Sequence, residues 1–243
     1  MYLNRMSMED FKEEISKGKI VLLPYGVAEE HGPHLPLGTD TIQIEKIIES
    51  AHSKRDFIVA PTVNYGLCSS TRNFPGTITI SFNILENLTY ELLCELDRNE
   101  VSKAIIISGH AGSDHMTALR VAAKRFARES SMMVIATSIA DLVLINQNDE
   151  LLKSFPPGDK HAGFVETSLM MYIENGIVKK DNLPPPSNPK FPDPLIIANA
   201  ETYFPSGIMG DPTNASSQKG KEIFETAVES LIKLIDWFEK EIS

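Results

Sequence analysis

One segment near the start of the chain gathers side chains that bind metal ions or transfer protons. It spans residues 26–40, with the sequence GVAEEHGPHLPLGTD, and directly follows a short apolar run. Glu29 and His31 are two residues apart, so in an extended chain they project to the same side. With Asp40 they offer the oxygen and nitrogen ligands that zinc, manganese and iron accept, and a carboxylate can bridge two ions. Because glutamate and histidine are also common in surface loops, this pattern alone does not establish a metal site.

A second histidine, placed between glycines, strengthens the prediction of a metal site. The apolar run 103–107 leads into residues 108–115, SGHAGSDH, which contain His110. In open α/β sheets, ligands bind outside the carboxyl ends of the strands. If the apolar runs are strands of one sheet, the donors of both segments face one crevice.

A third segment offers a group for acid–base catalysis. It spans residues 158–168, GDKHAGFVETS, and places His161 at the expected start of a helix. The positive end of a helix dipole lowers the pKa of a nearby histidine and favours the neutral imidazole, which can accept a proton. Two other interpretations remain open, namely His161 as a helix-capping residue and Glu166 as a solvated helical carboxylate.

Alternating apolar runs and amphipathic stretches indicate the scaffold that must position these segments. Near-continuous apolar runs, typical of strands buried on both faces, occur at residues 19–23, 57–60, 103–107 and 132–137. Patterns with helical spacing predict helices over residues 8–16, 41–50, 85–99, 114–130, 161–174 and 219–241. This alternation is typical of an α/β fold with crossover helices, and we expect a single domain over residues 1–243.

Local patterns refine this scaffold. Ser7 and Asp10 form a capping-box pattern at the start of the first helix. In the last helix, apolar residues repeat at intervals of three and four as far as Ile242, and Trp237 in this helix is expected to lie in the core. Residues 183–194 contain six of the fifteen prolines, which exclude a helix or a central strand there.

The charge and composition exclude several classes of partner. The net charge is −10 and no basic run is longer than two residues, which argues against nucleic acid and against an acidic membrane surface. No stretch approaches the ~20 apolar residues of a membrane-spanning helix, and charges interrupt the first residues before a signal peptide could form. The two cysteines, Cys68 and Cys94, lack C-x-x-C spacing. They are expected to be small buried hydrophobes and are typical of the reducing cytoplasm.

Four stretches of the sequence resemble the creatininase family of metal-dependent hydrolases. They are residues 26–40, 108–115, 161–168 and 207–220, and they occur in the family order. The resemblance implies a three-layer α/β/α sandwich with a mostly parallel central sheet, assembled into a homohexamer. It also implies two divalent metal ions per subunit, zinc, manganese or iron, which activate a water molecule for hydrolysis of a C–N bond.

The family's metal ligands correspond to four residues of this chain. By that correspondence Asp40 bridges the two ions, Glu29 and His110 complete the site of one ion, and His31 holds the other. The family's catalytic histidine corresponds to His161, which fits the acid–base role suggested above. The resemblance therefore implies one dinuclear centre with His161 beside it.

One family ligand is missing from the chain. Creatininase itself has a second-metal glutamate two positions after the histidine that corresponds to His110, and this chain has Gly112 there. The possible substitutes are Asp114, Glu166 or a water molecule. His34 is expected to support the ligands or to contact the substrate.

Together with these residues, the resemblance implies a hydrolase that acts on an amide, cyclic amide or formamide bond of a small-molecule or peptide-like substrate, rather than on ordinary peptide bonds. Creatinine itself is disfavoured, because creatininase uses stacking tryptophans and the one tryptophan here, Trp237, falls in the last helix. A formamide deformylase branch and a precursor-peptide peptidase branch of the family remain open. So does a metal- or small-ligand-binding homologue without turnover, which the glycine at position 112 suggests.

Overall fold

The central sheet has four parallel strands among the residues that the computed structural model describes, which are 1–146, 148–192 and 194–241. The strands lie in the order β2-β1-β3-β4, with bounds β1 (Val21–Tyr25), β2 (Ile58–Val59), β3 (Lys103–Ser108) and β4 (Met133–Ser138). Every residue of β1 and β3 is buried, as expected for strands covered on both faces. In the register of this pair, Tyr25 lies opposite Ser108, so the two strands end level with each other.

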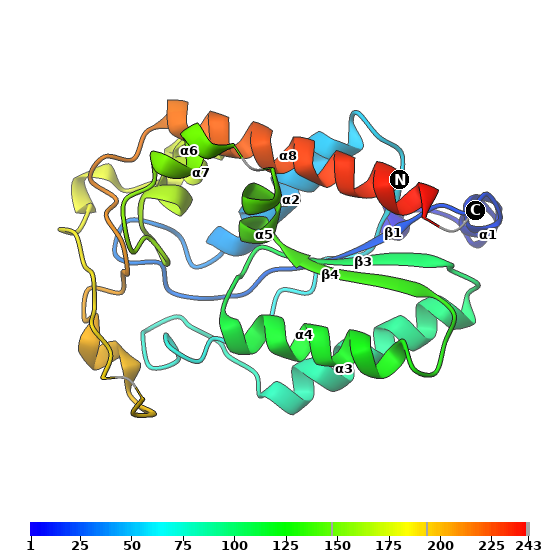
Figure 1. Ribbon diagram of the computed structural model, residues 1–243, viewed down its shortest axis with the longest axis horizontal. Coiled ribbons are helices and arrows are strands. Elements are labelled where there is room, and N and C mark those ends of the chain that lie inside the picture. Colours follow the sequence, from blue (N-terminus) through cyan, green and yellow to red (C-terminus); the bar gives the residue numbers. More distant parts are fainter. Residues whose placement is uncertain (147, 193, 242–243) are drawn as a thin grey trace.

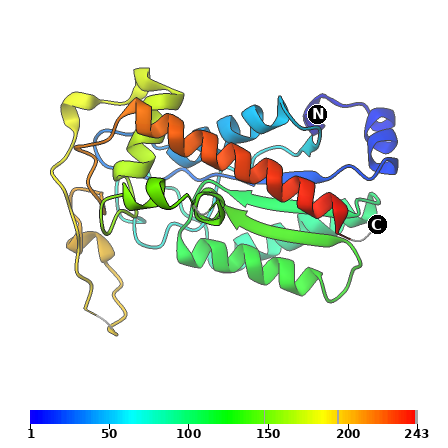
Figure 2. The same cartoon turned by 45° about the horizontal axis from the view of Figure 1, so that its top comes forward.

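Helices cover both faces of the sheet (Figures 1 and 2). One face packs against α2, α5 and α8, with α7 against α8, and the other packs against α3 and α4. The helices are α1 (Met8–Ser16), α2 (Thr39–His52), α3 (Phe82–Arg98), α4 (Ser113–Phe126), α5 (Ile139–Ile145), α6 (Asp149–Lys153), α7 (Phe164–Ile173) and α8 (Ser217–Lys240), with short 3₁₀ turns η1 (Leu3–Arg5), η2 (Asn175–Ile177), η3 (Lys180–Asn182) and η4 (Ala200–Tyr203). The predicted α/β/α sandwich with a parallel sheet is confirmed. Within the described part of the chain, no helix has the length and apolar character needed to cross a membrane.

Strand order explains where the loops that carry the candidate donors meet. After β1 the chain forms α2, which packs on one face of the sheet, and after β3 it forms α4, which packs on the other face. Because β1 and β3 are neighbours and their following helices pack on opposite faces, the segments after them start at a switch point of the sheet, where ligands bind in other open α/β sheets. Figure 1 shows these loops at the end of the molecule opposite the two termini.

Helix α1 begins as its sequence pattern predicts, and α5, which was not predicted, begins with the same pattern. The Ser7 hydroxyl accepts the Asp10 backbone N–H, and the Asp10 carboxylate accepts the Ser7 N–H. Ser138 and Asp141 form the same reciprocal capping box and start α5 directly after β4. Neither α5 nor α6 was predicted, although the S-x-x-D pattern at α5 was a usable signal.

Several predicted positions differ in the structure. The predicted helix over 161–174 begins only at Phe164, because Ala162 has φ 50°, a left-handed conformation that an α-helix cannot include. The prediction of a core position for Trp237 is wrong, since its exposed fraction is 52%. Cys68 is buried as expected but Cys94 is only partly buried. The end of the predicted apolar stripe, Ile242, lies outside the described residues.

A buried lysine ties the end of α8 to the start of β3. The Lys103 side chain donates hydrogen bonds to the carbonyl oxygens of Phe238, Glu239 and Glu241, at 2.8, 2.8 and 2.9 Å. The last carbonyls of a helix have no partner within the helix and carry partial negative charge, so an ammonium group satisfies both needs. Lys103 therefore anchors the longest helix to the strand whose other end leads to His110.

Replacing Lys103 by methionine should destabilise the fold while its apolar stem is kept. Because Lys103→Met leaves these carbonyls without their donor, we expect the free energy of unfolding in urea to fall by about 1–3 kcal/mol. The matched control is Lys233→Met, which removes a lysine with 66% side-chain exposure from the same helix and should leave the unfolding curve unchanged. Equal curves for Lys103→Met and the wild type would show that this anchor contributes nothing.

Candidate metal centre

The segment after β1 and the loop after β3 bring Glu29, Asp40 and His110 together. His110 Nδ1 lies 2.9 Å from Glu29 Oε2 and 3.5 Å from Asp40 Oδ2. The approach depends on Gly109, because a Cβ at this position would lie 2.1 Å from the backbone oxygen of Asp40. A glycine is therefore required for the loop after β3 to pack against the first turn of α2. His110 thus lies within reach of both carboxylates.

His31 presents an unpaired ring nitrogen to the other side of Asp40. Its Nδ1 lies 3.1 Å from the backbone oxygen of Glu29 and must donate, because a carbonyl oxygen can only accept. In the neutral ring this leaves the lone pair on Nε2, which lies 3.5 Å from Asp40 Oδ1. Hydrogen bonding of one ring nitrogen to a carbonyl is the usual way in which proteins orient a metal-binding histidine.

Glu166 reaches the same group from α7. Its Oε2 lies 3.7 Å from His31 Nε2, and one donor atom each from His31, Asp40 and Glu166 lies within 4.8 Å of the others. Gly112 has no side chain that could bind a metal ion, and a Cβ at this position would lie 2.4 Å from His110 Nε2. The His110 ring thus fills the space in which a side chain at position 112 would begin, and the carboxylate nearest to His31 and Asp40 comes from Glu166 instead.

The donor atoms fit divalent metal ions. Glu29 Oε2, His31 Nε2 and both carboxylate oxygens of Asp40 are buried and have no hydrogen-bond partner among the described residues. The exposed fractions of these residues are 2%, 0% and 1%. Buried polar atoms without partners cost free energy unless a ligand satisfies them, and their chemistry, carboxylate oxygen and imidazole nitrogen, suits zinc, manganese or iron.

The charges of the cluster shift one another's pKa values in the metal-free protein. Burial opposes ionisation, but the charge of His110 lowers the pKa of Glu29 to about 2, and those of His31 and His110 hold the pKa of Asp40 far below its usual range. Burial alone would lower the pKa of His31, yet Asp40 and Glu166 raise it to about 10. Glu29 and Asp40 likewise raise the pKa of His110 against the effect of burial. In the metal-free protein, protons on these imidazoles therefore supply the positive charge that a bound metal ion would otherwise supply.

His161 is oriented by Glu30, and one of its ring nitrogens lies within 4.8 Å of donor atoms of Glu29 and His31. Its Nε2 lies 2.9 Å from the backbone oxygen of Glu30 and 3.3 Å from Oε1 of the same residue. Since Nε2 must donate to the carbonyl, Nδ1 is the nitrogen left to accept a proton in the neutral ring. The rings of His161 and His31 are 4.4 Å apart between centroids. His161 thus has a fixed tautomer next to the candidate ligands.

The expected effect of the helix dipole on His161 is not found. His161 precedes the first residue of α7 by three positions. Burial and the charge of His31 lower its pKa, but the hydrogen bond to Glu30 and the carboxylates of Glu29 and Glu166 outweigh them, so its pKa is raised. The helix start is occupied instead by Asp159, whose two carboxylate oxygens accept the N–H groups of Phe164 and Val165.

The other predicted site residues lie outside the donor groups. His34 is buried, and its Nε2 lies 2.8 Å from the Thr167 hydroxyl. Asp114 lies in the first turn of α4, where its Oδ2 accepts a hydrogen bond from Ser69 at 2.7 Å. Among the described residues, neither belongs to a group of three or more possible metal donors.

Sequence reasoning missed three residues that contact this cluster. Glu30 orients His161, the buried Thr71 donates its hydroxyl to Glu29 Oε1, and Cys68 lies close to Glu29 and His110. Glu30 had a signal, because it lies between two candidate ligands in the first motif. Thr71 and Cys68 lie on the connection between β2 and α3, where no local pattern marks them.

Sequence comparisons relate the chain to known hydrolases. Residues 4–235 match the family model Creatininase, described as creatinine amidohydrolase. The mycofactocin precursor peptide peptidase of Mycolicibacterium smegmatis is 32% identical over 225 residues, which cover 86% of this chain and 81% of that protein. The creatinine amidohydrolase of Pseudomonas putida is 24% identical and covers 97% of this chain and 96% of that protein.

Solved structures share the fold. A crystal structure of creatinine amidohydrolase superposes with a TM-score of 0.88 at 20% identity, covering 97% of this chain and 96% of the other. A manganese form of creatininase superposes with a TM-score of 0.87 at 20% identity, covering 96% of each chain. The fold described above is therefore that of creatininase.

Metal binding to the metal-free protein should release protons. Because the raised pKa values of His31 and His110 lie above pH 7, both imidazoles carry protons at this pH that a metal ion must displace. Zinc binding should therefore release at least about two protons per chain. Apparent affinity should therefore rise with pH between 6 and 8. Calorimetry in buffers of different ionisation enthalpy measures the proton count, and His31→Asn should release fewer protons. Binding that is independent of pH would contradict the assignment of protonated imidazoles.

Proposed function

The chain belongs to the creatininase family of hydrolases, and we propose that it hydrolyses a C–N bond of a peptide-like or cyclic amide substrate at a centre of two divalent metal ions. The observation that carries this proposal is the set of buried donor atoms without partners on Glu29, His31 and Asp40. A protein that used these loops only for structure would have no reason to bury unpaired carboxylate oxygens.

We assign two sets of ligands, one for each ion, and both sets include Asp40. Glu29, Asp40 and His110 would hold one ion, and His31, Asp40 and Glu166 would hold the other, with Asp40 shared through its two oxygens. The distances of 3.5 Å from Asp40 Oδ2 to His110 and from Asp40 Oδ1 to His31 support a shared ligand. In this assignment Glu166 takes the place of the glutamate that is absent at Gly112.

The chain's own residues would position the substrate and move the proton. Divalent ions bound here would supply Lewis acidity, which lowers the pKa of water and polarises the scissile carbonyl. His161, held through Nε2 by the Glu30 carbonyl, would transfer a proton at Nδ1 to the departing nitrogen. The burial of the donors limits the access of bulk water and so strengthens these electrostatic effects.

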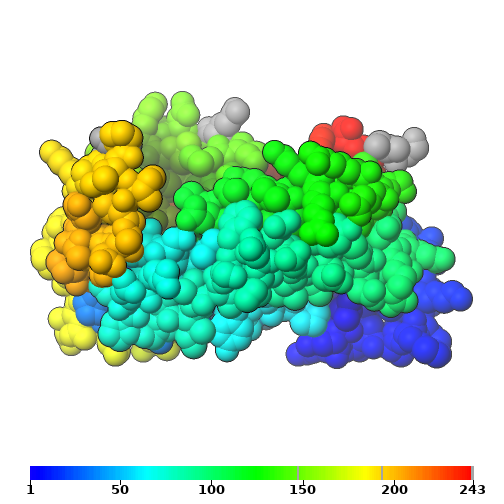
Figure 3. All heavy atoms as spheres, turned by 90° about the horizontal axis from the view of Figure 1, so that it is seen from below, coloured from blue at the N-terminus to red at the C-terminus, as the bar shows by residue number. Residues whose placement is uncertain are grey.

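The substrate class rests on the relatives and on a segment that lies near the site. The similarity to a precursor peptide peptidase supports a peptide-like substrate. Residues 194–210 lie against the connection between β2 and α3 (Figure 3), where Asn73 donates a hydrogen bond to Glu201 at 2.8 Å and the Phe74 ring packs on Phe204. Creatinine remains disfavoured, because Trp237 lies on α8 and belongs to none of the candidate donor loops.

A second candidate function is metal or ligand binding without turnover. The glycine at position 112 favours it, since one carboxylate of the creatininase centre is absent. Hydrolysis of a panel of short peptides, lactams and formamides with added zinc, manganese or iron distinguishes the two. Tight metal uptake without turnover across the whole panel would favour binding.

We further propose a cytoplasmic homo-oligomer, with a hexamer as the expected form. Two free cysteines, without a disulfide in the described residues, support a reducing compartment. Exposed apolar side chains support contacts between subunits, with Ile196 at 93%, Met8 at 79% and Leu195 at 65% exposure.

Removing the shared ligand should empty the centre. Because Asp40 serves both groups, Asp40→Asn should lose most of the bound metal, and we expect its content by mass spectrometry to fall far below that of the wild type. Asp97→Asn, on the exposed surface of α3, is the matched control and should keep the wild-type content. If wild type and Asp40→Asn carry the same metal content, the proposed centre is not there.

Removing His161 should impair turnover without removing metal. Loss of a general acid typically costs ~10²–10⁴-fold in rate, and we expect a decrease of this size in kcat for His161→Ala on any panel substrate that the wild type hydrolyses. Metal content should stay at the wild-type value, because the proposed ligand sets do not include His161. An unchanged kcat would exclude His161 as the proton donor.

A further inference from the structure

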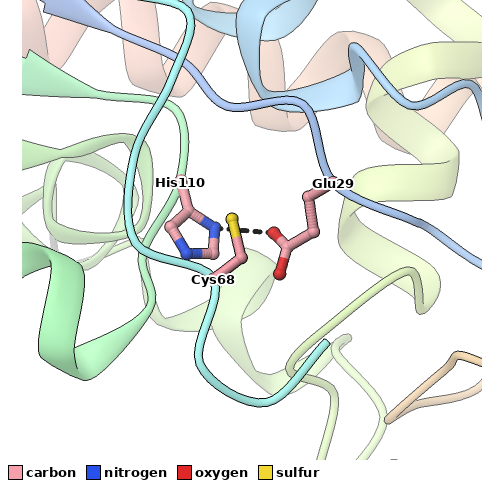
Figure 4. A group of neighbouring side chains, drawn as sticks. All are labelled: Glu29, Cys68 and His110. Atoms are coloured by element: carbon pink, nitrogen blue, oxygen red, sulfur yellow. Dashed lines mark ion pairs between the residues drawn. The ribbon is translucent and has the colours of Figure 1, made fainter. Parts of the chain in front are cut away.

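Cys68 lies among the ligands of the first proposed ion, and the catalytic assignment does not use it. Its exposed fraction is 1%. Its sulfur, a carboxylate oxygen of Glu29 and a ring nitrogen of His110 all lie within 4.8 Å of one another. Figure 4 shows the sulfur close to the His110 ring, on the side from which Glu29 approaches. A thiol that served only as core would be expected among apolar side chains rather than between a carboxylate and an imidazole.

The backbone around Cys68 is held on both sides. The Leu67 N–H donates to His115 Nδ1 at 3.2 Å, and the Cys68 N–H donates to the Thr79 hydroxyl at 2.9 Å. The Ser69 hydroxyl donates to Asp114 at 2.7 Å. Three consecutive residues are therefore anchored to two different segments, the start of α4 and Thr79, and the direction of the Cys68 side chain follows from this anchoring.

An independent observation points to a ligand at this position. Thr71 satisfies Glu29 Oε1, whereas Oε2 of the same carboxylate, on a side chain with 3% exposure, has no hydrogen-bond partner among the described residues. The free oxygen lies 2.9 Å from His110 Nδ1. Oxygen, nitrogen and sulfur donors thus surround one point, and the oxygen lacks any other partner.

We propose that the Cys68 thiolate is a ligand of the metal ion held by Glu29, Asp40 and His110. This inference rests on the proposed metal centre. On binding, the thiol proton is released to solvent and the sulfur–metal bond takes its place. Cys68 would add a fourth protein donor to this ion, whereas three residues, His31, Asp40 and Glu166, would hold the other. A thiolate also favours zinc over manganese at this position.

Cobalt substitution tests the sulfur ligand directly, because a thiolate bound to Co²⁺ gives a charge-transfer band in the near ultraviolet. Metal-free wild type, Cys68→Ser and the matched control Cys94→Ser are equilibrated with cobalt chloride. We expect the band in the wild type and in Cys94→Ser, and its complete loss in Cys68→Ser. A wild type that shows the visible cobalt spectrum without the charge-transfer band would overturn the inference about Cys68 but would still support the proposed metal centre. A wild type that takes up no cobalt would overturn both.

Competition between zinc and manganese gives a second readout that does not depend on activity. Changes to residues that support metal ligands typically lower metal affinity by about 10–100-fold. We expect Cys68→Ser and Cys68→Ala to lower zinc affinity by at least this factor, and manganese affinity by less. Unchanged zinc preference in both variants, each with a wild-type unfolding curve, would also overturn the inference.

Discussion

The structure is organised around buried charge at the carboxyl ends of β1 and β3. Glu29 and Asp40 are almost fully buried, and in the part of the chain that the structure describes the ion-pair partners of both are imidazoles. Isolated carboxylates in such a place would cost far more free energy than a small fold can supply. The cluster is tolerable only when cations fill it, either protons on His31 and His110 or metal ions. The loop glycines, the level strand ends and the anchored connection after β2 all keep this arrangement in place.

The scaffold meets this requirement with a simple topology. The loops after β1 and β3 diverge because their helices pack on opposite faces of the sheet, and the donors lie between them. The connection between β2 and α3 then adds Thr71 and Cys68 to the cluster, while His161 comes from the segment before α7 and Glu166 from α7 itself. The segments that directly follow two central strands thus carry the first donors, and segments positioned by tertiary contacts add the remainder.

This division also explains what could be read from the sequence. Buried apolar runs predicted β1 and β3, and the residues after them predicted the group of Glu29, His31, Asp40 and His110, because neighbouring parallel strands end at one edge. Glu30 and His161 are 131 residues apart, and no local pattern joins them. The left-handed Ala162 shifted the start of α7, since alanine carries no signal for that conformation. Cys68 resembled a core residue because only the folded chain brings it to Glu29.

The burial of the donors has a kinetic consequence. With Glu29, His31, Asp40 and His110 exposed by 8% at most, an ion at the proposed centre would exchange through local opening of the surrounding segments. The rate of exchange is then set by the frequency of opening rather than by affinity. An ion captured as the chain folds would persist through purification, so the metal found in the isolated protein would record the supply in the cell more faithfully than the thermodynamic preference of the site.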